Sequence, residues 1–71
     1  MSFIYGQTVY IHEEGSKLIF AAKYIHSATL ETGESYCVWK MPTIEGFEVC
    51  KLSAVFATKE EAQAHRAGEA A

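Results

Sequence analysis

Residues 35–52 constrain the possible fold more than any other part of this sequence. Ser35–Met41 is rich in aromatic and β-branched residues, Thr43–Gly46 is a turn signal, and Phe47–Leu52 is a second apolar run. Pro42 stands at the end of the first run, where its missing N–H removes no interior ladder bond. The stretch predicts a β-hairpin, and it contains the only Trp and both cysteines of the chain.

A four-residue turn would decide which side chains face each other across this hairpin. It would place Cys50 opposite Trp39 and Cys37 opposite Leu52. One apolar face would then be made of Cys37, Trp39, Met41, Cys50 and Leu52. A slip of one residue would move all of them to the other face.

The length of the chain predicts one small domain that spans residues 1–71. A chain of this size buries roughly 60–65% of the surface that it exposes when unfolded. Hydrophobic residues make up 49% of the sequence, with four Tyr, four Phe and one Trp. We therefore expect a packed core and no disorder, with no cleft between lobes.

Residues 4–12 predict a strand that precedes the hairpin. Val9 and Ile11 would share one face, and Tyr10 and His12 would share the other, because successive side chains alternate. Glu13–Ser16 is a turn signal that would close a first hairpin.

Residues 17–29 fit two structures. Small and apolar residues recur at a helical spacing behind Ser16, a possible N-cap, whereas the β-branched and aromatic residues of the segment favour a strand. We favour a long strand that bends at Ala21 and Ala22, followed by a second turn at 31–34. A helix here would replace the β-barrel with an α+β fold.

The last predicted element is a helix over residues 59–67. Thr58 and Glu61 form a capping box, in which each side chain satisfies an unpaired amide at the start of the helix. Gly68 is expected to end the helix. So short a helix does not persist alone in water, so it must dock on the sheet. The expected docking residues are Ala62 and either His65 or Ala64.

Two runs of the sequence, Gly6–Tyr10 and Val49–Ala62, resemble parts of a small SH3-like barrel of the KOW or Tudor type. The first is similar to the start of the first strand in such barrels. In the second, a hairpin would lead through a single-turn helix, at about 53–56, into the terminal element. The resemblance implies a mainly β fold, a small antiparallel barrel of four to five strands with a short C-terminal helix.

The resemblance also implies a class of function. Barrels of this group mostly bind peptides, methylated side chains or nucleic acids, and they rarely catalyse. This sequence lacks the acidic loop and paired Trp residues of peptide-binding SH3 domains, and also the basic loops of ribosomal KOW proteins. Fold resemblance by itself does not fix the function.

The charge of the chain argues against binding that depends on a cationic surface. Nine acidic residues outnumber six Lys and Arg, for a net charge of −3, so few cations can release counterions from a nucleic acid. The longest apolar stretch, 18–30, is interrupted by polar residues and is too short to span a bilayer. Without a leader-like start, we expect a cytoplasmic protein with reduced thiols and no contact with a membrane.

Five residues of the chain have side chains that suit zinc: Cys37, Cys50, His12, His26 and His65. The cysteines are not in a C-x-x-C spacing, and the histidines lie on three different predicted elements. We therefore expect no metal site and no cofactor, with the cysteines buried and the histidines at the surface. A fold stabilised by metal at the two cysteines is a weaker alternative. No spacing suits nucleophilic catalysis, so we expect no enzyme.

The aromatic side chains outnumber what one small core needs. We expect a partner-binding surface made of Tyr10, Tyr24, Tyr36, Trp39 and Lys40. The chain is thus predicted to be a non-enzymatic interaction module, an accessory or regulatory protein of bacterial or phage origin. It would bind another protein or a second copy of itself as a homodimer. The alternative is a small nucleic-acid-binding barrel that uses its exposed Tyr and Lys residues.

Overall fold

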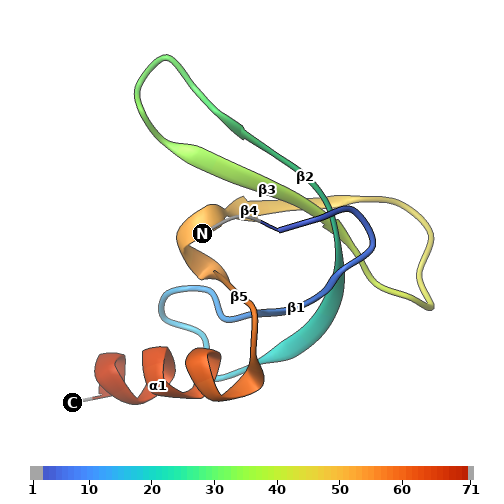
Figure 1. The fold of residues 1–71 in the computed structure, drawn as a ribbon. Coiled ribbons are helices and arrows are strands. Elements are labelled where there is room, and N and C mark those ends of the chain that lie inside the picture. The colour runs from blue at the N-terminus through green and yellow to red at the C-terminus, as the bar shows by residue number, and fades with distance from the viewer. Residues whose placement is uncertain (1–2, 71) are drawn as a thin grey trace.

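A computed structural model describes residues 3–70 as one antiparallel sheet with a C-terminal helix (Figure 1). The structure therefore confirms the mainly β class and the five-strand count. The elements in chain order are β1 (Thr8–Ile11), β2 (Phe20–Thr29), β3 (Ser35–Lys40), β4 (Glu48–Lys51), a 3₁₀ turn η1 (Leu52–Ala54), β5 (Val55–Phe56) and α1 (Lys59–Ala70).

The strands follow the order β4-β3-β2-β1-β5. Strands β1 to β4 form a simple antiparallel meander, after which η1 reverses the chain so that β5 pairs with β1. β4 and β5 are the two ends of this order and are not paired with each other. The sheet curls strongly (Figure 1) but is not closed, so the expectation of a barrel was wrong, because the two end strands β4 and β5 share no ladder that would close it.

The ambiguous segment is a strand over Phe20–Thr29, as we expected. It pairs with β1 through Phe20–Lys23 and with β3 from Lys23 to Thr29, so ladder bonds on both sides override the helical spacing. The irregularity lies between Tyr24 and His26 rather than at the alanine pair. The expected position of the bend was wrong, because one extra residue in β2 forms a bulge there.

The β3–β4 hairpin has a different register from the predicted one. Cys37 lies opposite Cys50, and Trp39 lies opposite Glu48. The connection from Met41 to Phe47 is longer than the four-residue turn that we assumed, which shifts the pairing by two residues. A shift by an even number keeps every side chain on its face, so the predicted apolar face is confirmed.

The core lies on the concave side of the curled sheet. Small and branched side chains from β1 and β2 meet the aromatic and sulfur-bearing side chains of β3 and β4. Its buried members are Val9, Ile11, Ala22, Tyr24, Cys37, Trp39, Cys50, Ala54 and Val55, with Phe3, Phe20, Met41 and Leu52 partly buried around them.

The C-terminal helix begins as predicted and ends later. The amide of Glu61 donates to the hydroxyl of Thr58 at 3.2 Å, which confirms the N-cap. The helix continues through Gly68 to Ala70, so the predicted stop was wrong. Ala62 is buried and His65 is half-buried, whereas Ala64 is exposed, so the docking face contains the first two. No helix in residues 3–70 is long and apolar enough to cross a membrane.

The N-cap of α1 supports a prediction about stability. Thr58→Ala leaves the Glu61 amide without its partner and lowers the free energy of unfolding by about 0.5–2 kcal/mol. Urea unfolding followed by circular dichroism measures this loss. Thr58→Ser keeps the hydroxyl acceptor and stays close to the wild type. Equal stability of the alanine variant and the wild type would show that the cap is not needed.

Candidate functional site

The structure separates the five predicted partner-binding residues. Tyr24 and Trp39 lie opposite each other on β2 and β3, and each is only 7% exposed. Both rings belong to the core, so the expectation that they form an exposed platform was wrong. The register explains this, because it turns both side chains to the concave face.

Tyr10, Tyr36 and Lys40 lie on the outer face of the sheet and are half-buried. Lys40 is paired with Lys23, and Tyr36 is paired with Lys51, so three lysines share this face. The Tyr36 hydroxyl donates to Glu34 at 2.8 Å, and this hydrogen bond to a carboxylate raises the pKa of Tyr36. Three lysines and the carboxylate that bonds to Tyr36 thus lie on or beside this face, although the chain as a whole is anionic.

A groove of about 480 Å³ opens beside the C-terminal end of β3. Its floor is apolar: Phe20, Trp39 and Met41 line it, and the rings of Phe20 and Trp39 lie 5.1 Å apart at 52°. Leu18 and Ile44 stand on its rim and are 71% and 61% exposed. Trp39 thus contributes to the site through one edge of a mostly buried ring.

The rim of the groove is acidic. Glu13 comes from the turn after β1, Glu45 from the β3–β4 loop, and Glu48 from the start of β4. No Lys, Arg or His is among the described residues that line the groove. An apolar floor with an acidic rim suits a ligand that is itself apolar and basic.

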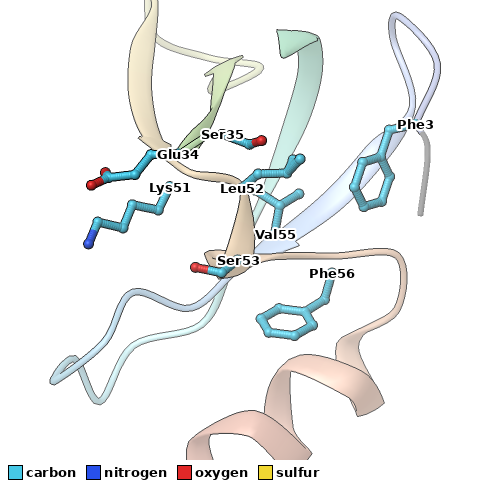
Figure 2. A pocket seen from close by; sticks show the side chains of 8 residues that line it. All are labelled: Phe3, Glu34, Ser35, Lys51, Leu52, Ser53, Val55 and Phe56. Carbon is cyan, nitrogen blue, oxygen red and sulfur yellow. The ribbon is translucent and has the colours of Figure 1, made fainter. Parts of the chain in front are cut away.

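A second hollow, of about 650 Å³, lies along the seam between β4 and β5 (Figure 2). Its apolar lining consists of Phe3, on the right in Figure 2, Phe56 near the helix, and Leu52 and Val55 in the middle of the view. The hollow contains one acidic and one basic side chain, Glu34 and Lys51, together with Ser35 and Ser53. Its lining has no net charge, so it gives no electrostatic preference for a ligand.

The fold also brings together three polar side chains that are far apart in sequence. His12, just after β1, is fully buried, although we expected it at the surface. Its amide donates to the carbonyl of Ala54 at 2.9 Å, which holds the chain beneath α1. His65 and Glu69 reach it from α1, and the two Nδ1 atoms of the histidines are 2.7 Å apart.

The hydrogen bonds fix the tautomer of His12. Its Nε2 lies 2.7 Å from the carbonyl oxygen of Ser16, which can only accept, so Nε2 carries the hydrogen. In the neutral ring, Nδ1 is then a bare acceptor that faces His65. Glu69 Oε2 lies 3.6 Å from Nδ1 of His65 and 3.9 Å from that of His12. Oε1 accepts the amide of Gly15, a residue with φ +83°, at 2.9 Å.

The sequence contained only part of the signal for this cluster. His65 and Glu69 are one turn apart on a predicted helix and therefore share a face. Nothing in the local pattern connects them to His12, which is 53 residues from His65. Our expectation of no metal site rested on the separation of the histidines along the chain, and the fold removes that separation for two of them.

The two cysteines are buried, directly opposed and present as free thiols. Burial raises the pKa of Cys37, and burial first and the neighbouring Cys37 second raise the pKa of Cys50 to about 11. Both side chains therefore remain thiols at neutral pH, which makes them weak nucleophiles and weak metal ligands.

The raised pKa of Cys50 supports a prediction about alkaline stability. Between about pH 9 and 11 the folded chain keeps a proton that the unfolded chain has lost, so the free energy of unfolding falls as the pH rises. Cys50→Ala removes this contribution, so its stability falls less steeply across the same window. Urea titrations at several pH values compare the two slopes. Identical slopes would contradict the prediction.

Comparisons with known proteins add no family to this description. No protein-family model matches the sequence, and no curated protein or solved structure is detectably similar to it.

Proposed function

We propose that the protein is a non-enzymatic interaction module whose groove binds an extended, apolar and basic segment of a partner protein. The observation that supports this most directly is the groove itself, with aromatic side chains in its floor, Leu18 and Ile44 exposed on its rim and three glutamates around it. Apolar side chains of such a segment would pack on the floor and against Leu18 and Ile44, and its Lys or Arg residues would pair with the glutamates.

The exposed aliphatic side chains would supply the affinity. Leu18 and Ile44 both line the groove and are largely exposed, and fully burying one such side chain is worth about 1.5–3 kcal/mol. Glu13, Glu45 and Glu48 would add steering and specificity for Lys or Arg. This electrostatic part weakens with salt, whereas the apolar part does not.

The free edge of β4 would add backbone hydrogen bonds. Among residues 3–70, β4 is paired with β3 only. Val49 on this strand is 60% exposed, and Phe47, just before it, is 64% exposed. Glu48 lies on this strand and on the groove rim, so a segment in the groove reaches the edge. Strand addition to an open edge is a common way to bind an extended peptide.

The topology supports the resemblance to SH3-like barrels as part of this proposal. The resemblance rests on a last hairpin that leads through a single-turn helix into a terminal element, and here the β3–β4 hairpin leads through η1 into β5, which returns to β1. Peptide binding is common in that group. Two opposed cysteines kept as thiols fit a reducing compartment, so we propose that the protein lies in the cytoplasm. We also propose that it is an accessory protein of a bacterium or phage.

Tryptophan fluorescence tests the groove, because Trp39 is the only Trp and lines it. Two synthetic peptides share their apolar residues, and one carries Arg and Lys where the other carries Glu. We expect the basic peptide to change the emission and to bind at least about tenfold more tightly. Ile44→Ser should weaken it by about tenfold or more, from the lost apolar burial.

The control is Leu30→Ser, which removes an exposed leucine at the β2–β3 turn, outside the groove. It should bind the basic peptide as the wild type does. Equal binding of the two peptides, or equal effects of the two serine variants, would contradict the proposal. Light scattering after gel filtration tests whether a second copy of this chain occupies the groove. A dimer that is lost in Ile44→Ser would show that the groove binds this chain and not a segment of a different protein.

A second candidate function rests on the outer face. Lys23, Lys40 and Lys51 lie there with Tyr10 and Tyr36. The outward positions of the strands contain these three lysines and no carboxylate, and the acid beside this face is Glu34, which accepts a hydrogen bond from the Tyr36 hydroxyl. Cations beside aromatic rings suit a single-stranded nucleic acid.

Fluorescence anisotropy with single-stranded and duplex oligonucleotides tests this second function. On this hypothesis the oligonucleotide binds at low salt. Lys40→Gln should reduce the slope of log binding constant against log salt concentration by about one. Lys59→Gln, on the helix, serves as the control with unchanged binding. An absence of affinity even at low salt excludes the nucleic-acid function and leaves the groove hypothesis intact.

A further inference from the structure

We infer that His12, His65 and Glu69 form a binding site for a divalent transition-metal ion, of which Zn²⁺ is the best fit. The ligand atoms would be the two Nδ1 atoms and Oε2 of Glu69. Two imidazoles and one carboxylate are a common ligand set for zinc. This inference is independent of the groove, because no residue of the cluster lines it.

The spacing of the three atoms suits a tetrahedral ion. Zinc bonds of roughly 2.0–2.1 Å place neighbouring ligand atoms roughly 3.3 Å apart. Here the two nitrogens are 2.7 Å apart, and Oε2 of Glu69 lies 3.6 Å from Nδ1 of His65 and 3.9 Å from Nδ1 of His12. Opening the short nitrogen pair by a fraction of an ångström, as the carboxylate moves inward, would admit the ion.

The outer hydrogen bonds already orient two of the three ligands, His12 and Glu69, whereas His65 would bind the ion in the tautomer that carries its hydrogen on Nε2. Metal-bound histidines usually donate their other N–H to a backbone carbonyl or a carboxylate. His12 does this with Ser16, which leaves Nδ1 unprotonated and aimed at the cluster. Glu69 is held in the same way, since Oε1 accepts the Gly15 amide while Oε2 faces the nitrogens.

The surroundings favour a cation. Glu13 and Glu14 line a hollow of about 360 Å³ that His12 and His65 also line, and Glu69 is part of the cluster itself. Lys51 lines the same hollow, and Arg66 on the helix donates to the carbonyl of Lys17 at 3.1 Å. The hollow leaves room for a water molecule to complete the coordination of the ion.

A metal ion here would join α1 to the turn after β1. The cluster takes one ligand from the end of β1 and two from the helix. An ion that binds only the folded chain stabilises it by RT ln(1 + L/Kd), where L is the concentration of the free ion and Kd its dissociation constant. Metal binding would therefore appear as a gain in thermal stability.

The test titrates the full-length chain, first freed of metal with a chelator, with ZnCl₂ in a calorimeter. Thermal unfolding is measured in parallel, with zinc and with zinc plus excess EDTA. We expect one ion per chain, a rise in melting temperature and its reversal by EDTA. Co²⁺ should show the strong visible absorption of a tetrahedral site.

The variants separate a metal site from a purely hydrogen-bonded cluster. Glu69→Gln keeps an oxygen that can accept from Gly15 but loses the carboxylate, and His65→Ala removes a half-buried ligand. Both should weaken zinc binding by about tenfold or more and abolish the cobalt spectrum. His26→Ala, which removes the histidine outside the cluster, should bind as the wild type does.

Two results would overturn the inference. One is a wild-type chain that shows neither heat of binding nor a change in melting temperature at millimolar zinc. The other is zinc binding that is unchanged in Glu69→Gln, which would place the ion elsewhere on the chain. If His65→Ala fails to fold, Glu69→Gln and His26→Ala still decide the outcome.

Discussion

The two-sided pairing of β2 is the interaction on which the rest of the structure depends. Its first residues are bonded to β1 and its later residues to β3, and Lys23 belongs to both ladders. The bulge between Tyr24 and His26 lies just beyond this shared residue and adds the local bend that curls the sheet. Because of this curl, β1 and β4 face a common core, and the two-residue β5 can return to β1.

The turn between β1 and β2 connects the helix to the groove. His12, Gly15 and Lys17 each contact α1, through hydrogen bonds to His65, Glu69 and Arg66. These contacts, together with the burial of Ala62, hold a helix that would be marginal alone. Glu13 of the same turn lines both the groove and the hollow beside the histidines. The position of the helix and the shape of the groove therefore depend on one short segment.

Local pattern predicted the strands, the helix and the apolar face of the hairpin, because each depends on near neighbours. It failed at the β3–β4 loop, whose length it did not predict, and where a distant contact decides. The length of the β3–β4 loop set the register, and the contact of Glu69 with Gly15 accompanies a helix that runs past Gly68. The partner surface was predicted from residue type, and two of its five members, Tyr24 and Trp39, are in the core. An aromatic side chain is equally apolar in a core and on a binding surface, so the residue type alone could not show in which of these places it lies.

The sequence by itself determined which side chains of the β3–β4 hairpin share a face and where the helix starts. Alternation with a period of two and a capping hydroxyl act within a few residues, so neighbouring residues are enough to predict them. Only the tertiary structure decided that the sheet stays open between β4 and β5, that a groove with an acidic rim forms, and that His12 meets His65 and Glu69. These features join segments as much as 53 residues apart, and the curl of the sheet, rather than any local preference, fixes the distances between such segments.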